Sequence, residues 1–581
     1  MIKILKYLKP YTHLALITVA LVVVDSYVTL YLPDLMSQIV DKGITRGNVD
    51  YIWQTGAKML LVSLIQVLAI IFMSLTSSKA AMGVGKDLRN HIFKKVQSFS
   101  LGEIDQFSTA SLITRTTNDI TQIQQAIVMI LRMVIRAPVI AAGSIVMAVS
   151  KDAKLTMILL VSVPIAAVAM YFIFSKTMPL FKSMQKKIDR LNLVLRERVT
   201  GVRVIRAFNK EDHEKERFEK ANVDLTQTAL KVNRIGAVIF PIMMIVMNFT
   251  IIALVWFGSK QIDMGQLQVG SMMAVMQYVI QILFSFIMIS MIFIFLPRAS
   301  VSAQRVIEVL KTTPTVLQPS DPTEPTGKGV IRFEDVSFYY PGAKEAALEN
   351  ISFEAQPGKM TAIIGSTGSG KTTILNLIMR FYDVTRGTVK IDGVDVRHIP
   401  LERLRGMIGY APQKAVIFSG TIADNIRFGR DELSNEDVLR AAEIAQVDEF
   451  TQKMPEGLNS PVAQGGTNLS GGQKQRISIA RAIAGKPKIY LFDDTFSALD
   501  FKTDARVRAK LLKEVKDATV IIVAQRVATV MNADQIIVIK DGKVQGIGNH
   551  KQLMNTCPVY KDIVLSQLSE EEAVGGDSNG K

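Results

Sequence analysis

Six apolar segments, each long enough to cross a lipid bilayer as a helix, lie in the first 300 residues of this 581-residue chain. They cover residues 14–38, 56–77, 126–149, 154–177, 236–258 and 270–296. A helix needs roughly 20 apolar residues to cross the hydrocarbon core, and the overall hydrophobic fraction of 49% is high for a soluble protein. The sequence therefore predicts a membrane domain of six helical spans, with helices that continue beyond the membrane in two long polar stretches.

Basic residues are distributed unevenly around these segments. Residues 182–234 contain about 14 lysines and arginines, whereas the short connections 42–52, 150–154 and 259–269 contain about five together. Positive charge marks the cytoplasmic side of a membrane protein, so we expect both long loops, both termini and everything after residue 300 in the cytoplasm. The net charge of +16 then reflects topology and gives no support to nucleic-acid binding. The single cysteine and the lack of a targeting extension fit a prokaryotic inner membrane.

The chain changes character after the last apolar segment. Residues 311–329 contain four prolines and are predicted to be a linker. From residue 330 to 567, short apolar runs of strand type alternate with helical patterns, which predicts an α/β domain with a mainly parallel sheet. Residues 1–310 form the predicted membrane domain, and the acidic, glycine-rich residues 568–581 are predicted to be a disordered tail.

A phosphate-binding loop opens this second domain. GSTGSGKT at 365–372 follows an apolar strand and precedes a helix, which is the full P-loop pattern. Backbone N–H groups of such a loop turn toward phosphate oxygens, Lys371 reaches the β- and γ-phosphates, and Thr372 offers its hydroxyl to Mg²⁺. The predicted phosphate site comprises Gly365, Ser366, Thr367, Gly368, Ser369, Gly370, Lys371, Thr372 and Thr373.

A second motif narrows the class of nucleotide-binding protein. LSGGQ at 469–473 begins a helical segment, and an apolar strand ending in Asp493 follows it after about 20 residues. With the P-loop, these motifs make the last part of the chain resemble the ATP-binding domain of ABC transporters, and the six spans resemble the membrane domain of an ABC exporter. The resemblance implies an ATP-driven exporter of hydrophobic or amphipathic compounds such as drugs or lipids.

The same resemblance implies further site residues. Tyr340, which has Tyr339 beside it, corresponds to the aromatic residue that stacks on adenine, and Gln413 to the glutamine that senses Mg²⁺ and the γ-phosphate. Asp493 would hold Mg²⁺ through water. Two such domains pair head to tail in the family, so a second ATP site would be completed by Ser470, Gly471, Gly472, Gln473 and Asp500.

Two positions depart from the family pattern. Asp494 stands where a glutamate normally polarises the attacking water, and Gln525 stands where a histidine contacts the γ-phosphate. Aspartate is shorter than glutamate by one C–C bond, roughly 1.5 Å, and misplacement by about 1 Å can cost roughly a hundredfold in rate. Glutamine can donate a hydrogen bond to phosphate but carries no charge. Hydrolysis at this P-loop is therefore expected to be slow.

These departures predict a subunit of a heterodimeric exporter. Its own P-loop would form the slow site, and its LSGGQ would complete the fast site of a homologous partner that supplies glutamate and histidine. The alternatives are an active homodimer that tolerates both changes, a slow homodimeric lipid flippase, and an ATP-gated channel or regulatory membrane subunit. A soluble ABC ATPase is excluded by the six spans.

Charged residues in the membrane half are the remaining candidates. Asp25, Arg132 and Arg136 lie inside predicted spans, where ionisable groups are expensive and commonly functional. Substrate contact, structural pairing and a misplaced span edge all remain open for them. Asp41 is a candidate for an external gate. By resemblance, residues 98–115 and 207–218 hold the coupling helices, although the second segment is also consistent with a solvated charged face.

Overall fold

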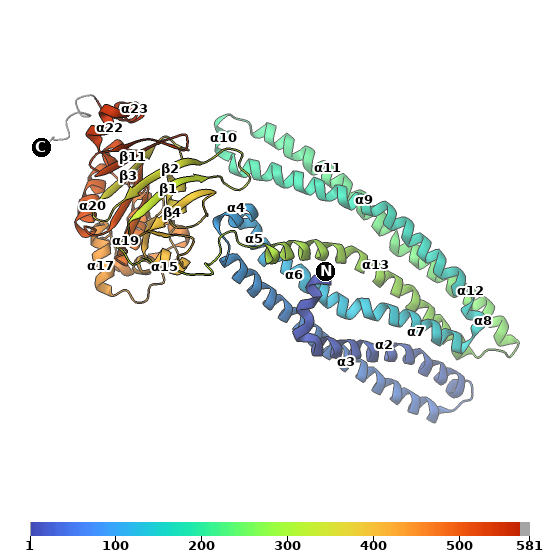
Figure 1. Cartoon of the computed structure of the whole chain (residues 1–581). Helices are drawn as coiled ribbons and strands as arrows, with labels where there is room; N and C mark the ends of the chain where they lie inside the picture. Colours follow the sequence, from blue (N-terminus) through green and yellow to red (C-terminus); the bar gives the residue numbers. More distant parts are fainter. Residues whose placement is uncertain (1, 570–581) are drawn as a thin grey trace. The chain divides into compact units, whose positions relative to one another are not determined.

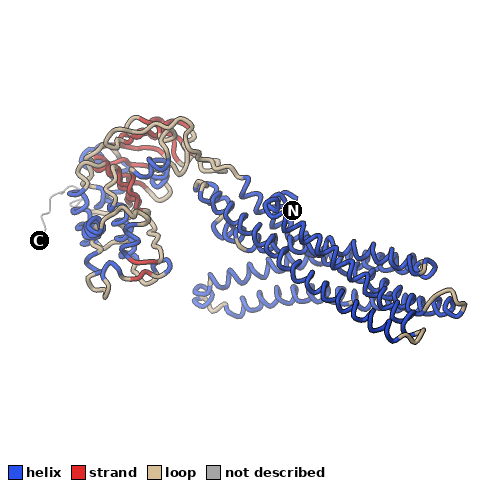
Figure 2. The backbone as a smooth tube through the Cα atoms, turned by 90° about the horizontal axis from the view of Figure 1, so that it is seen from below, coloured by secondary structure: helices blue, strands red, loops and turns tan. Residues whose placement is uncertain are grey.

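The computed structural model describes the backbone of residues 2–569, so residues 570–581 of the predicted tail lie outside the described residues. The chain forms two compact units. The helical unit comprises Met1–Lys95 and Ala110–Thr312, and the α/β unit comprises Val96–Thr109 and Thr313–Lys581. Figure 2 shows that strands occur in the α/β unit, while the described part of the helical unit is drawn as helices and loops.

Helices of the helical unit are joined by short connections (Figure 1). The long ones are α2 (Thr12–Gln38), α3 (Val49–Gln97), α6 (Asn118–Met129), α7 (Ile135–Lys151), α9 (Leu159–Thr200), α11 (Glu211–Ala237), α12 (Ile239–Asp263) and α13 (Val269–Lys311). The short ones are α1 (Ile2–Leu5), η1 (Lys6–Tyr11), η2 (Ile39–Ile44), α5 (Thr109–Thr116), η3 (Ile130–Val134), α8 (Ala153–Thr156) and α10 (Val202–Ala207). Within the described residues, six helical runs are long and apolar enough to cross a membrane, which confirms the predicted number of spans.

Several of these helices are longer than a bilayer requires. The 42 residues of α9 correspond to roughly 60 Å at about 1.5 Å per residue, twice the thickness of a hydrocarbon core of about 30 Å. α9 and α11 run side by side and are joined by α10 (Figure 1). Their polar halves agree with the expected continuation of the helices beyond the membrane, and the side on which they lie stays a prediction.

Helix α13 is the centre of packing in the helical unit, because it contacts α2, α6 and α7. Tyr278 of α13 is fully buried and donates its hydroxyl to the carbonyl oxygen of Leu30 in α2 at 3.0 Å. Gln281, one turn further on, donates to the carbonyl oxygen of Thr29 at 3.1 Å and accepts from Ser144 of α7 at 3.0 Å. Buried polar groups that are paired in this way fix the register of the three helices.

The α/β unit is built on two larger sheets. The six-stranded sheet has the order β12-β11-β3-β10-β9-β6, and only the β11–β12 pair in it is antiparallel. Its strands are β3 (Met360–Gly365), β6 (Ile408–Ala411), β9 (Ile489–Asp493), β10 (Thr519–Ala524), β11 (Gln535–Lys540) and β12 (Lys543–Gly548). The four-stranded antiparallel sheet consists of β1 (Ile331–Phe338), β2 (Leu348–Ala355), β4 (Arg386–Ile391) and β5 (Val394–Asp395), and β7 (Gly420–Thr421) pairs with β8 (Pro461–Val462).

Strands β3, β9 and β10 are buried along their whole length, which explains their continuous apolar sequences. The helices of this unit are α4 (Leu101–Phe107), α14 (Lys371–Ile378), α15 (Leu401–Gly406), α16 (Ile422–Arg427), α17 (Asn435–Ile444), α18 (Asp448–Thr451), α19 (Gly471–Ala484), α20 (Phe501–Glu514), α21 (Val527–Val530), α22 (His550–Thr556) and α23 (Pro558–Leu565). Two short turns, η4 (Gly457–Asn459) and η5 (Gln464–Gly466), complete it. Parallel strands carry loops at a common carboxyl edge, where ligands of open α/β sheets bind.

Helix α4 packs with the α/β unit although the sequence places it between two membrane spans. Ser100 and Glu103 form a capping box at its start, and Glu103 also accepts from the N–H of Thr315 at 3.2 Å. The hydroxyls of Ser100 and Thr315 are 2.9 Å apart. At the other end of α4, Tyr382 donates to the Oδ2 atom of Asp105 at 3.2 Å. These contacts join the first predicted coupling helix to the strand-containing domain.

Candidate nucleotide site and membrane path

The P-loop lies between the end of β3 and the start of α14. Gly370 caps α14 with φ +100°, and Gly368 has φ +81°. A β-carbon on Gly370 would lie 2.7 Å from the carbonyl oxygen of Ala347, and one on Gly365 would lie 2.1 Å from that of Ile539. Glycine is therefore required at these positions, and the N–H groups of the first turn of α14 face an anion-binding loop.

Lys371 is buried at the start of α14 and folds back over this loop. Its Nζ atom donates to the carbonyl oxygens of Gly365 at 2.9 Å and Ser366 at 2.7 Å. Burial lowers the pKa of Lys371, although the carboxylates of Asp494 and Asp493 oppose that shift. An ammonium group held against the loop carbonyls is well placed for a phosphate that enters the loop.

The next residue connects the loop to strand β9. Thr372 donates its hydroxyl to the Oδ1 atom of Asp493 at 3.0 Å. Burial and the neighbouring Asp494 raise the pKa of Asp493, while the hydrogen bond from Thr372 opposes the rise. The buried hydroxyl of Ser369 has no hydrogen-bond partner among the described residues. A hydroxyl and a carboxylate that converge on one point are oxygen ligands suited to Mg²⁺, so the residues present fit a nucleotide bound with that ion.

Asp494 follows in a left-handed backbone conformation, with φ +46°. Its N–H donates to the carbonyl oxygen of Val523 in β10 at 2.8 Å, and its Oδ2 atom accepts from Nε2 of Gln413 at 3.2 Å. Gln413 comes two residues after β6, so three neighbouring strands bring these groups to the carboxyl edge of the sheet. Aspartate tolerates a left-handed φ better than most longer side chains, so the local backbone suits the residue that this chain has.

Gln525 follows β10 at the same edge, and its side chain is exposed. The side chain of Gln525 makes no hydrogen bond among residues 2–569. The backbone carbonyl oxygen of Gln525 accepts from Nε2 of Gln567 at 2.9 Å. Gln567 also accepts from the N–H of Val527 at 2.9 Å. The end of the described chain therefore holds the backbone around Gln525, while the amide group of Gln525 is free to meet a ligand.

Tyr340, rather than Tyr339, lies beside the P-loop helix. Its hydroxyl is 2.9 Å from the hydroxyl of Thr373, whereas the side chain of Tyr339 is 43% exposed. The ring of Tyr340 is edge-on to the ring of Tyr382, with centroids 5.4 Å apart. The sequence allowed either tyrosine, and the fold places Tyr340 next to the P-loop helix. Contact of Tyr340 with adenine stays a prediction.

The signature residues form the start of α19. Ser470 caps this helix and accepts from the N–H of Gln473 at 3.3 Å, and the N–H of Ser470 donates to the Oε1 atom of Gln473 at 2.8 Å. Gly471 and Gly472 are the first two residues of α19, and Ser470 is exposed. Asp500 caps α20 by accepting from the N–H of Thr503 at 2.9 Å, which lowers the pKa of Asp500. Among the described residues, no hydrogen bond links these groups to the P-loop, as expected if they serve the ATP site of a second chain.

Comparison with known proteins decides the family. The ABC transporter transmembrane region matches residues 15–286, and the ABC transporter model matches residues 348–497. An uncharacterized ABC transporter ATP-binding protein of Mycobacterium tuberculosis is 44% identical over 576 residues, which are 98% of each chain. The chain belongs to the ABC transporter family.

Two further comparisons agree with this assignment. The uncharacterized ABC transporter ATP-binding protein YfiB of Bacillus subtilis is 38% identical over 98% of this chain and 99% of its own. A solved structure of a bacterial Atm1-family ABC exporter with ATP bound superposes with a TM-score of 0.80, over 97% of this chain and 99% of that chain, at 24% identity. This ABC transporter is thus an ATPase in which an ABC membrane domain and an ABC ATP-binding domain share one chain, with the fold of an exporter.

The charged residues in the spans of this ABC transporter form two groups. Asp25 of α2 is fully buried, and its Oδ2 atom lies 2.8 Å from Nε of Arg136 in α7. Gln66 of α3 donates to Oδ1 of Asp25 at 3.1 Å and to the hydroxyl of Thr29 at 2.9 Å. The structure therefore pairs Asp25 with Arg136, which is the structural pairing that the sequence left open.

Arg132 of η3 has neutral partners instead. Its Nε donates to the hydroxyl of Ser77 at 2.6 Å, and its Nη2 donates to the carbonyl oxygen of Ser74 at 2.9 Å and to two serine hydroxyls. Both Arg132 and Arg136 lie inside the helical run from Thr109 to Lys151, whose 43 residues are more than a bilayer requires, so the position of the span edge stays open for them. Substrate contact by these arginines stays a prediction.

Asp41 lies in η2, between α2 and α3. Its Oδ1 atom accepts from the N–H of Gly270 at 2.6 Å, and the hydroxyl of Ser271 is 3.5 Å from its Oδ2 atom. This carboxylate satisfies a backbone donor at the start of α13, where an acceptor stabilises the helix. Its role in an external gate stays a prediction.

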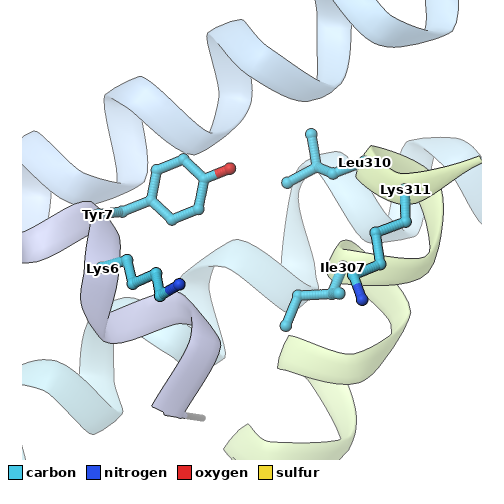
Figure 3. A pocket seen from close by; sticks show the side chains of 5 residues that line it. All are labelled: Lys6, Tyr7, Ile307, Leu310 and Lys311. Carbon is cyan, nitrogen blue, oxygen red and sulfur yellow. The ribbon is translucent and has the colours of Figure 1, made fainter.

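A separate hollow of about 510 Å³ lies at the end of the helical unit where α13 finishes. Figure 3 shows Lys6 and Tyr7 of η1 on one side of this hollow and Ile307, Leu310 and Lys311 of α13 on the other. The hollow contains none of the residues that the sequence predicted for ATP or substrate. It is therefore not part of the candidate sites described above.

Sequence reasoning missed several partners of the predicted residues. Gln66 and Gln281 are polar residues inside predicted spans, so their polarity alone could have identified them as candidate partners of buried polar groups. Tyr382 and Gln567 lie outside every motif, and only the three-dimensional contacts identify them.

Proposed function

We propose that this ABC transporter is one subunit of an ATP-driven exporter and that its own P-loop belongs to a slow ATP site. The observation that carries the proposal is Asp494, which replaces the catalytic glutamate while the P-loop, Asp493 and LSGGQ are retained. A site that keeps its ATP-binding groups but has a shorter general base is expected to bind ATP normally and to hydrolyse it slowly. Gln525 supports the same conclusion, because it offers phosphate a neutral donor in place of a cation.

The residues divide between two composite sites. Lys371, Thr372, Asp493, Asp494 and Gln525 would act on the ATP of this chain, where Mg²⁺ would neutralise charge on the phosphate oxygens. Ser470 and the N–H groups of Gly471 and Gly472 would complete the γ-phosphate site of a partner chain. The exposure of Ser470 and the capping of α19 support this role, because the N-terminus of that helix is accessible to a second chain.

We place this exporter subunit in a prokaryotic inner membrane with the α/β unit and both termini in the cytoplasm. The concentration of lysine and arginine in residues 182–234 supports this orientation. The cargo is a hydrophobic or amphipathic compound that enters from the cytoplasm or the inner leaflet. ATP binding would pair two nucleotide domains, and hydrolysis at the partner-supplied site would reset the spans.

The mass of the intact complex tests the proposal. A tag on this chain is used to purify the complex from the membranes of its native host, and native mass spectrometry measures it in a mild detergent. We expect one 64.2 kDa chain with a different subunit of similar size, whose sequence supplies the glutamate and histidine. A complex of two 64.2 kDa chains would contradict the heterodimer and would favour the slow homodimeric flippase or the ATP-gated channel.

Uptake into inside-out vesicles separates transport from channel activity. An exporter accumulates an amphipathic dye against a concentration gradient in the presence of ATP, whereas a channel only equilibrates it. Vesicles with Lys371→Ala in this chain serve as the control for ATP binding at its own site. Equilibration without accumulation would overturn the export function.

A further inference from the structure

A cavity of about 430 Å³ lies in the helical unit between α3, α6, η3, α7 and α13. Its apolar wall includes four methionines, Met73, Met129, Met133 and Met288, together with Phe295. The volume is in the range that small-molecule sites of proteins occupy. Methionine side chains are flexible and polarisable, so this wall can adapt to apolar groups of different shape.

Two arginines line the same cavity, and no acidic residue does so among the described residues. Arg136 is paired with Asp25, which is fully buried behind it. Among the described residues, the hydrogen bonds of Arg132 go to serine hydroxyls and a carbonyl oxygen. Because an arginine in a protein stays protonated, the cavity has one positive charge that forms no ion pair with a carboxylate in the described part of this unit.

Both arginines have N–H groups that are available to hydrogen-bond a ligand. Nη1 of Arg132 and both terminal nitrogens of Arg136 donate no hydrogen bond to any described residue. An unneutralised cation is costly inside a membrane, and an anion brought to it would be bound strongly by charge-assisted hydrogen bonds. The charge therefore favours a ligand with an acidic group, and the methionine wall favours an apolar body on that ligand.

We propose that this cavity binds an anionic amphiphile, with its phosphate, sulfonate or carboxylate on Arg132 and Arg136 and its apolar part among the methionines. Identification of this ligand as the cargo rests on the export function proposed above. Occupancy of the cavity rests on the arginines and the methionine wall alone. Arg132 determines the preference for anions, because Arg136 is already neutralised by Asp25.

Binding to the purified native complex in lipid nanodiscs, without ATP, tests the proposal. Three probes separate the contributions: lysophosphatidic acid has both acyl chain and phosphate, the monoacylglycerol of the same chain lacks phosphate, and glycerol 3-phosphate lacks the chain. We expect lysophosphatidic acid to bind roughly tenfold to a hundredfold more tightly than the monoacylglycerol, which is the range for one charge-assisted hydrogen bond. Glycerol 3-phosphate is expected to bind more weakly than either.

Variants at one position assign the effect to Arg132. Arg132→Gln is expected to remove the preference for lysophosphatidic acid while leaving monoacylglycerol affinity unchanged, and Arg132→Lys is expected to retain the preference. Arg46→Gln is the matched control, because Arg46 is an exposed residue in a turn outside the cavity. A purely structural role for Arg132 would weaken all probes equally in the glutamine variant.

Two other results would overturn the proposal. Equal affinity for lysophosphatidic acid and the monoacylglycerol would show that the arginines do not recognise an anion. Tight binding of glycerol 3-phosphate alone would make the site one for a free phosphate ester and not for an amphiphile. Because nucleotide is absent, none of these outcomes depends on whether the ATP site is slow or on which subunit hydrolyses ATP.

Discussion

Replacing Asp494 by glutamate is expected to restore hydrolysis at the ATP site of this chain. The substitution adds one C–C bond, roughly 1.5 Å, between the backbone and the carboxylate. If the carboxylate of Asp494 lies about 1 Å too far from the attacking water, the hydrolysis rate is lower by roughly a hundredfold. This factor corresponds to about 2.7 kcal/mol in the activation free energy, at 1.36 kcal/mol per factor of ten.

The backbone reduces this gain. Asp494 has φ +46° and is 8% exposed, so a glutamate there must adopt a left-handed conformation in a confined space. That conformation costs roughly 1 kcal/mol more for a longer side chain than for aspartate. The difference is about 1.7 kcal/mol, so Asp494→Glu is expected to increase the hydrolysis rate of this site by roughly 20-fold.

The assay must silence the other site. In the heterodimer proposed above, the glutamate that the partner subunit is expected to supply is changed to glutamine, and phosphate release is measured with saturating ATP and Mg²⁺. Asp494→Asn in the same background is the control, because it keeps the size of the side chain and removes the carboxylate. A rate for Asp494→Glu no higher than that of the parent would refute the argument that the short side chain limits hydrolysis.

Three other predictions follow from contacts in the two units. Tyr382→Phe removes the hydrogen bond that Tyr382 donates to Asp105 of α4, at a cost of roughly 1–3 kcal/mol. ATP binding is expected to stay normal while ATP-dependent dye accumulation falls, and equal losses in both would contradict a coupling role. Asp25→Asn leaves the guanidinium of Arg136 without its buried partner, which is expected to destabilise the helical unit by roughly 3–5 kcal/mol, measured by thermal unfolding in detergent, and an unchanged midpoint would refute the pairing. Burial raises the pKa of Glu103, but hydrogen bonds from Ser100 and Thr315 outweigh it and hold this pKa below its ordinary value. The contribution of Glu103 to docking of α4 is therefore complete when the pH is above the ordinary pKa, and it is lost as the pH falls through the lowered pKa. Protection factors of the amides of residues 100–107, which correct for the slower intrinsic exchange in acid, are therefore expected to fall at acidic pH in the parent, and Glu103→Gln should show low protection at every pH.

The sequence predicted the spans and the P-loop because each depends on local pattern. A run of about 20 apolar residues has few alternatives to a membrane helix, and the glycines of the P-loop are required by close backbone approaches at Gly365 and Gly370. Strands β9 and β10 are neighbours, so their carboxyl ends carry Asp493, Asp494 and Gln525 at one edge of the sheet; the family resemblance, and not a predicted strand order, had assigned these residues to one site.

Partners contributed by distant segments were not predictable in the same way. Nothing near Asp25 in the sequence indicates that Gln66 or Arg136 contacts it, because these residues lie 41 and about 110 positions away on other helices. The sequence placed residues 98–115 in the predicted domain 1–310 as a coupling segment, whereas α4 contacts Thr315 in the predicted linker and Tyr382 beyond the linker. Such contacts depend on the angles at which helices cross and on which distant segments pack together. The local spacing of apolar residues determines neither of these.

The row of contacts from Thr373 through Tyr340 and Tyr382 to Asp105 has a consequence for what α4 senses. Within this row, the ring of Tyr340 is the group expected to stack on adenine, whereas Thr373 belongs to the predicted phosphate site, so base occupancy and loop occupancy would reach α4 through different atoms. Inorganic tripolyphosphate would fill the loop and leave the ring of Tyr340 uncovered. The helix that follows the second span would then respond to the nucleobase, and a transporter that holds one ATP for long periods would keep that helix engaged for as long as the base stays in place.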